Sequence, residues 1–230
     1  MIYQTVLEAA KNKKFGKVRK PKNYFLEYDF NFTPYRNRHV KVLEIGVQAG
    51  GSLAMWQQYF TNSEITGLDI DPACSQFERD NIKIYIGSQE NQNLLKTIDR
   101  DRGPFDIIID DGGHTMRQQI ETCNTLFPLV AEGGVYVIED TQTSYWHEFG
   151  GAKGRQYTAV GFLKSLIDSM HYEAIQSPRV SIFYRAWNKV RPFQPAPRND
   201  FEKSLRAVYI ADGIAFLKKE MRRTHEILKF

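Results

Sequence analysis

Three short segments of the chain place acidic side chains, glycines and a histidine directly after apolar runs. Residues 107–114 read Ile-Ile-Ile-Asp-Asp-Gly-Gly-His, and residues 135–140 read Val-Tyr-Val-Ile-Glu-Asp. Residues 40–46, Val-Lys-Val-Leu-Glu-Ile-Gly, end in a glycine-rich turn. Because open α/β sheets bind ligands at the carboxyl ends of their strands, these side chains are expected to meet there. Four carboxylates and one histidine at that edge predict a metal site with a base beside it.

The elements that must position these residues alternate along the chain. Strands are expected at 40–45, 64–70, 82–86, 105–110 and 134–138, and helices at 52–60, 91–99, 115–130 and 159–170. Such alternation predicts βαβ units and a mostly parallel sheet. The apolar runs at 107–109 and 135–138 are typical of strands covered on both faces. A closing strand pair is expected at 172–175 and 180–187.

The length of 230 residues fits one domain. We expect an N-terminal arm at 1–38, a Rossmann-like core at 39–190 and a helical C-terminal extension at 191–230. Residues 201–228 have helical spacing and a charged face, and they are a candidate contact with the core or with a second copy of the chain. A homo-oligomer formed through this segment is one possible arrangement.

Composition excludes several classes of protein. Cys74 and Cys123 are not part of a CxxC pair, so thiol-based zinc or redox chemistry is not expected. Two unpaired cysteines are typical of a reducing compartment, and we expect a cytoplasmic location. No apolar run approaches the length of a membrane span, and the first residues lack the order of a signal peptide. The net charge is +4. Basic runs at 11–22 and 218–223 are read as a solvated loop and an exposed helix face, because no nucleic-acid motif accompanies them.

The turn after the first expected strand indicates a ligand site. Residues 46–51, Gly-Val-Gln-Ala-Gly-Gly, lie between a strand and a helix whose amino terminus can offer free N–H groups to an anion. Asp69 ends the next strand, where an acid can bind ribose hydroxyls. The glycine spacing does not match GxGxxG, so a dinucleotide fingerprint is not met. A tight turn with a structural acid is the alternative interpretation.

At this point the sequence resembles a known family. The segments 43–46 (Leu-Glu-Ile-Gly), 67–70 (Gly-Leu-Asp-Ile) and 105–110 (Phe-Asp-Ile-Ile-Ile-Asp) are similar to successive motifs of class I S-adenosylmethionine-dependent methyltransferases. Residues 109–114, 126–130, 133–140 and 143–146 resemble the metal-dependent macrolide sugar O-methyltransferases of the mycinamicin and macrocin type, a group that includes cephalosporin hydroxylase-like proteins. Gly113 departs from that pattern, which more often has serine there, and residues after Arg191 have no counterpart that we can place.

The resemblance implies a fold, two cofactors and a set of site residues. The fold is a Rossmann-like, doubly wound, seven-stranded α/β sheet, mostly parallel with an antiparallel final strand. The cofactors are S-adenosyl-L-methionine and Mg²⁺ or a similar divalent cation. The metal ligands are Asp111, Glu139 and Asp140, and the general base is His114. The expected cofactor contacts are Glu44, Gly46, Ser52, Asp69, Ser88, Gln89 and Asp110.

Elementary chemistry agrees with these roles. Oxygen ligands suit a hard cation that keeps open positions, and two neighbouring sugar hydroxyls can fill them. Coordination lowers the pKa of a hydroxyl, and a histidine can then accept the proton near neutral pH. Structural alternatives stay open: Asp110 can orient the turn, His114 can cap the next helix, and Glu139 and Asp140 can be solvated loop acids. Tyr145 and Trp146 can pack the loop or stack on a sugar.

The predicted function is methyl transfer to a hydroxyl of a sugar or glycosylated natural product, with a small-molecule glycoside as partner. Two other functions are kept. A catechol-like diol needs similar metal chemistry, and a non-catalytic S-adenosylmethionine-binding or RNA-binding protein would use the basic runs. The intact acid and histidine set argues against the second. Nucleic acid and membrane are not expected partners.

Overall fold

The computed structural model of the chain describes residues 5–11, 17–172 and 199–221. In these residues one sheet has seven strands in the order β3-β2-β1-β4-β5-β7-β6. The strands are β1 (Val40–Ile45), β2 (Ser63–Asp69), β3 (Ile82–Ile86), β4 (Ile107–Asp110), β5 (Val135–Ile138), β6 (Leu205–Ala211) and β7 (Ile214–Lys219). Strands β1 to β5 pair in parallel, and β7 pairs antiparallel with both β5 and β6. The predicted fold class is confirmed.

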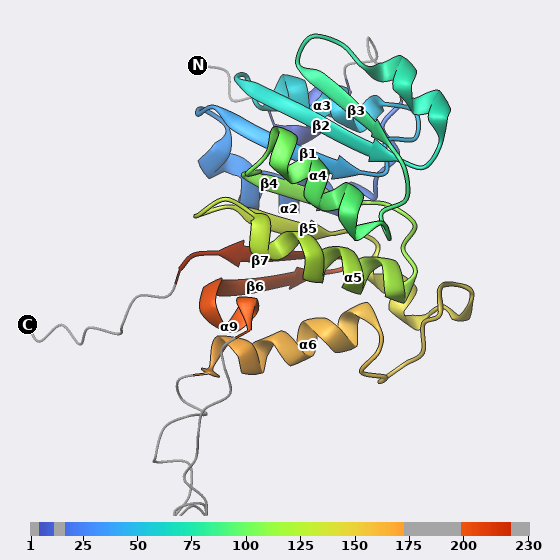
Figure 1. The fold of residues 1–230 in the computed structure, drawn as a ribbon, viewed down its shortest axis with the longest axis vertical. Coiled ribbons are helices and arrows are strands. Elements are labelled where there is room, and N and C mark those ends of the chain that lie inside the picture. Colours follow the sequence, from blue (N-terminus) through green and yellow to red (C-terminus); the bar gives the residue numbers. More distant parts are fainter. Residues whose placement is uncertain (1–4, 12–16, 173–198, 222–230) are drawn as a thin grey trace, which may run out of the picture.

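Helices cover both faces of the sheet (Figure 1). The α-helices are α1 (Val6–Ala10), α2 (Lys22–Phe32), α3 (Gly51–Tyr59), α4 (Gln92–Arg102), α5 (Met116–Leu126), α6 (Ala159–Met170) and α9 (Asp200–Ser204). Short 3₁₀ helices are η2 (Thr33–Tyr35), η3 (Pro72–Phe77), η4 (Phe127–Leu129), η5 (Thr141–Tyr145) and η6 (His147–Phe149). None of the helices within the described ranges is long and apolar enough to cross a membrane.

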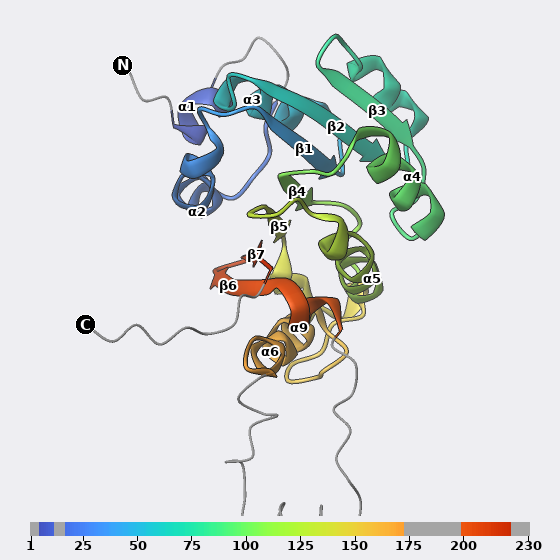
Figure 2. The same ribbon diagram turned by 60° about the vertical axis from the view of Figure 1, so that its left-hand side comes forward.

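Two apolar cores lie on the two faces of the sheet. Helices α1, α2 and α3 pack on one face around Tyr28 and Trp56, whose rings meet edge to face with centroids 5.0 Å apart. Helices α4, α5 and α6 pack on the other face around Leu95, Leu126 and Leu163. Figure 2 shows this division, with α1 and α2 on one side of the sheet and α4 and α5 on the other. Alternate side chains of each strand therefore enter different cores.

The structure corrects the prediction for the C-terminal part. Residues 201–228 were expected to be helical, but helix α9 ends at Ser204, and β6 and β7 follow as an antiparallel pair. Asp212 and Gly213 form the two-residue connection, and an Asp-Gly pair between two apolar runs is a hairpin signal. The core sheet therefore extends beyond residue 190. The strands expected at 172–175 and 180–187 fall almost wholly on residues outside the described ranges.

Candidate active site

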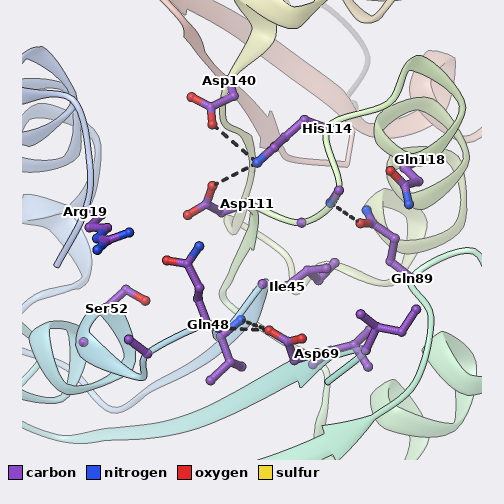
Figure 3. Close-up of a pocket in the computed structure, with 18 of the residues that line it drawn as sticks. Arg19, Ile45, Gln48, Ser52, Asp69, Gln89, Asp111, His114, Gln118 and Asp140 are labelled. Atoms are coloured by element: carbon purple, nitrogen blue, oxygen red, sulfur yellow. Dashed lines mark hydrogen bonds and ion pairs between the residues drawn. The ribbon is translucent and has the colours of Figure 1, made fainter. Parts of the chain in front are cut away.

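A cavity of about 360 Å³ opens at the carboxyl ends of the parallel strands. Its walls come from the turn after β1, the ends of β2 and β3, the loop between β4 and α5, and Asp140 after β5. The remaining wall is the segment Lys17–Lys20 before α2. Figure 3 shows Arg19 and Ser52 on one side of this cavity, Asp69 and Gln89 on another, and His114 with two acids at its upper edge.

Backbone conformation marks this cavity independently. In the described residues, the non-glycine residues with positive φ are Gln48 (48°), His114 (58°) and Asp140 (54°), and all three line the cavity. Left-handed backbone is uncommon for residues with a Cβ atom, and such residues concentrate at functional sites. Two of these three positions, His114 and Asp140, are the predicted base and one predicted metal ligand.

His114 faces two carboxylates. Its Nε2 lies 3.4 Å from Asp140 Oδ2 and 3.8 Å from Asp111 Oδ1 (Figure 3). Asp111, His114 and Asp140 each offer a ligand atom, and these atoms lie within 4.8 Å of one another. All three side chains are partly exposed at the cavity. The two carboxylates of this group suit a hard divalent cation that keeps positions open for solvent or substrate oxygens, and His114 adds a nitrogen beside them.

Glu139, the third predicted ligand, is in a different environment. Its carboxylate is buried, and Lys20 Nζ lies 2.8 Å from Oε1 and 2.9 Å from Oε2. The same ammonium lies 2.7 Å from Asp111 Oδ2 and 3.5 Å from Glu44 Oε1. Burial disfavours the charged form of Lys20, but the carboxylates of Glu139, Asp111 and Glu44 outweigh it and hold the pKa of Lys20 well above its usual value. A lysine ammonium thus occupies the inner side of the acid cluster.

Helix α2 supplies two tyrosines to the adjacent acids. Tyr24 and Tyr28 are four residues apart and so lie on the same helix face. The Tyr28 hydroxyl donates to Glu139 Oε1 at 2.5 Å, and the Tyr24 hydroxyl lies 2.9 Å from Asp140 Oδ1. Both tyrosines are almost fully buried. The expected N-terminal arm is therefore a structural part of the site.

The other half of the cavity has the predicted glycine turn and strand-end acid. Asp69 Oδ2 accepts hydrogen bonds from the backbone N–H groups of Val47 (2.8 Å) and Gln48 (2.9 Å). Burial acts to raise the pKa of Asp69, but backbone N–H donors, including that of Asp71, outweigh it and lower the pKa. Asp69 therefore fixes the turn as an ionised group. Five of the residues expected to contact the cofactor line the cavity: Gly46, Ser52, Asp69, Ser88 and Gln89.

Two predicted cofactor contacts do not line the cavity. Asp110 is 1% exposed, and its carboxylate accepts from Gln89 Nε2 and from the Tyr136 hydroxyl, each at 3.1 Å. Burial raises its pKa to about 7. Glu44 is fully buried and faces Lys20. Both lie beneath the site because the last side chains of a buried strand point alternately into the two cores.

Sequence reasoning missed Lys20, Arg19 and the two tyrosines of α2. Lys20 belongs to the run 11–22, which was interpreted as a solvated loop, yet its side chain is 2% exposed. The run contains no acid that could neutralise it locally, so its partners had to come from elsewhere in the chain. The acids after β4 and β5 are those partners.

Comparisons with known proteins agree with this geometry. A family model described as a methyltransferase domain matches residues 43–141. The chain is 36% identical over 202 residues to 8-demethyl-8-(2-methoxy-alpha-L-rhamnosyl)-tetracenomycin-C 3'-O-methyltransferase of Streptomyces olivaceus, covering 84% of this chain and 48% of that protein. It is 43% identical over 160 residues to mycinamicin VI 2''-O-methyltransferase of Micromonospora griseorubida, covering 65% of this chain and 40% of the relative.

A solved structure shows the same fold. The MycE methyltransferase from the mycinamycin biosynthetic pathway, in complex with Mg, SAH and mycinamycin VI, superposes with a TM-score of 0.73 at 34% identity. The match covers 90% of this chain and 52% of that one. The chain thus spans about half the length of the curated relatives and of this neighbour.

Proposed function

A methyltransferase-domain model matches residues 43–141, and on that premise we propose that the chain is a class I S-adenosylmethionine-dependent methyltransferase that methylates a hydroxyl of a sugar on a glycosylated small molecule. The observation that carries the proposal is the convergence of Asp111, His114 and Asp140 at the edge of the cavity. The named activities of the two relatives, O-methylation of a rhamnosyl group and of mycinamicin VI, support a sugar acceptor.

We propose that S-adenosylmethionine binds along the cavity. Asp69 lies at the end of β2, where acids of this fold class bind ribose hydroxyls. Gly46 and Ser52 lie at the turn and at the first residues of α3, whose amino terminus offers N–H groups. Ser88 and Gln89 form the opposite wall. Glu44 and Asp110 do not contact the cofactor themselves but hold residues that line the cavity. Glu44 faces Lys20, and Asp110 accepts a hydrogen bond from Gln89.

We propose that Asp111, Glu139 and Asp140 hold a divalent cation, with Mg²⁺ as the first candidate because the donors are oxygens. Asp111 and Asp140 have carboxylates that reach the cavity edge. Glu139 can take part only if it shares or gives up its contacts with Lys20 and Tyr28. When bound, the cation would lower the pKa of an acceptor hydroxyl and orient it.

We propose that His114 Nε2 accepts the proton of that hydroxyl. Asp140 Oδ2 and Asp111 Oδ1 lie 3.4 and 3.8 Å from Nε2, so the two carboxylates orient the imidazole at the cavity. The main-chain carbonyl of His114 accepts a hydrogen bond from Thr143 Oγ1 at 3.0 Å, which fixes the loop that carries the base. Positioning of the hydroxyl against the methyl donor would supply much of the remaining rate.

The test is methyl transfer from labelled S-adenosylmethionine to a panel of glycosides and one catechol, with Mg²⁺ or with EDTA. We expect label in the glycosides with Mg²⁺ and none with EDTA. Labelling that is insensitive to EDTA would refute the metal role. Labelling of the catechol alone would show that the acceptor is an aromatic diol and not a sugar. Asp111→Asn serves as the matched inactive variant.

A further inference from the structure

Large aromatic side chains are exposed on the segment between β5 and α6, next to His114. Trp146 is 45% exposed and Tyr157 is 60% exposed. Phe149 is partly exposed, and its ring centroid lies 5.9 Å from that of Trp146 and 6.4 Å from that of His114. Exposed aromatic surface is costly in water, so a cluster at the edge of a site indicates a ligand contact.

The backbone beneath these rings is held firmly. Gly151 N donates to Trp146 O at 2.9 Å, and Val160 N donates to Ser144 Oγ at 3.1 Å. Thr141, Thr143 and Ser144 are buried beneath the segment. The rings are therefore presented on a preorganised surface, which lowers the entropic cost of binding a ligand.

Phe149 and Tyr157 line a shallow hollow that shares no lining residue with the cavity described above, whereas Trp146 contacts Phe149 but does not line the hollow. Phe149, Tyr157 and Met116 supply apolar walls, and Thr115, the residue after His114, connects the hollow to the base. Arg117 and Glu148 also line it and supply its charged groups. The acids that would orient sugar hydroxyls, Asp111 and Asp140, line the cavity with His114 and do not line this hollow.

We propose that the hollow binds the apolar aglycone of the acceptor while the sugar of the same molecule reaches His114. This inference rests on the proposed function and adds the part of the acceptor that is recognised. A sugar in the hollow would lie away from Asp111 and Asp140, the acids that can orient its hydroxyls beside His114. A flat or cyclic hydrocarbon skeleton satisfies the rings and leaves the polar end of the molecule at the base.

The test uses pairs of glycosides that share a sugar and differ in aglycone: methyl against 2-naphthyl α-L-rhamnoside, and methyl against 2-naphthyl β-D-glucoside. Binding to the full chain is measured by calorimetry with S-adenosylhomocysteine and Mg²⁺ present. We expect the naphthyl member of at least one pair to bind tenfold or more tightly than its methyl partner. Tyr157→Ala and Phe149→Ala are each expected to remove most of that advantage and to leave the affinity for S-adenosylhomocysteine unchanged.

A matched control is Phe30→Ala. Phe30 is 68% exposed on α2, packs against Tyr209 with centroids 5.6 Å apart, and lines neither hollow nor cavity. It should leave the advantage intact. A naphthyl glycoside that binds no better than its methyl partner, or whose advantage survives both Tyr157→Ala and Phe149→Ala, overturns the proposal. The calorimetry measures binding without turnover. Absence of methyl transfer would therefore refute the proposed function without changing the outcome of the aglycone test.

Discussion

Lys20 and Glu139 form a buried ion pair in which one ammonium contacts both carboxylate oxygens, at 2.8 and 2.9 Å. The two side chains are 2% and 1% exposed. Because Asp111 and Glu44 contact the same ammonium, Lys20 places one positive charge among three acids and so reduces their mutual repulsion. The pair also joins the segment before α2 to the ends of β4 and β5, and so closes one wall of the cavity.

The first prediction concerns the charge of Lys20. Lys20→Met keeps most of the length of the side chain, removes the ammonium, and leaves Glu44, Asp111 and Glu139 without their cation. Breaking a buried ion pair from one side costs about 3–5 kcal/mol, so the free energy of unfolding should fall by that order in EDTA. The measurement is urea-induced unfolding of the variant and of Lys22→Met, which changes an exposed lysine at the start of α2.

Comparison of Lys20→Met with the unchanged chain also tests whether a metal ion and the Lys20 ammonium compete for the same carboxylates. We expect Mg²⁺ to raise the melting temperature of Lys20→Met more than that of the unchanged chain, because the cation then replaces a missing positive charge. Equal stabilisation of both proteins by Mg²⁺ would show that the ammonium and the metal do not compete.

The second prediction concerns His114. His114→Asn should lower turnover about 10²–10⁴-fold, the usual contribution of a general base. Its affinities for S-adenosylhomocysteine and for Mn²⁺ are measured by calorimetry. They should stay within about twofold of those of the unchanged chain, because the loss of one exposed contact changes a binding free energy by only a few tenths of a kcal/mol. The potential ligand atoms of His114, Asp111 and Asp140 lie within 4.8 Å of one another, so His114 is also placed to bind a metal ion. Loss of Mn²⁺ binding would therefore make His114 a metal ligand instead of the base.

The third prediction concerns Asp69 and pH. The pKa of Asp69 is lower in the folded chain than its usual value, so its ionised form stabilises the fold above the unfolded pKa, and this contribution is lost as pH falls through the folded pKa. Asp69→Asn should lower the free energy of unfolding by about 1–3 kcal/mol at pH 7, the cost of hydrogen bonds to a charged group. In urea titrations the difference should shrink below about pH 4, near the usual pKa of an aspartate.

A constant difference between pH 3 and pH 7 would mean that Asp69 does not act through its charge. Asp80→Asn is the control, because Asp80 is an exposed acid in the loop before β3. That variant should show no comparable change with pH.

The sequence predicted β1 and β3 with their observed bounds and β2, β4 and β5 to within two residues, because each is an apolar run bounded by turn residues. It failed at β6 and β7, where Leu205–Ala211 also fits helical spacing and only the Asp212-Gly213 connection distinguishes a hairpin. It placed the acids and His114 correctly in one region. It could not find Lys20 or Tyr28, since their partners are about 90 to 120 residues away and no local pattern encodes such contacts.

The final prediction concerns Gly46, where two loops of the site pass each other. Its φ is +92°, and a Cβ atom built there would lie 2.0 Å from the Asp111 carbonyl oxygen. Gly46→Ala should therefore incur both the cost of left-handed backbone, about 1–2 kcal/mol, and the displacement of the loop that carries Asp111 and His114. Gly133 has φ +73° with nothing within 4 Å of a built Cβ, so Gly133→Ala incurs the backbone cost alone. We expect Gly46→Ala to lower the melting temperature further than Gly133→Ala and to lose S-adenosylhomocysteine binding in calorimetry, whereas Gly133→Ala keeps it. Equal destabilisation with binding retained in both would show that the turn and the acid loop move independently.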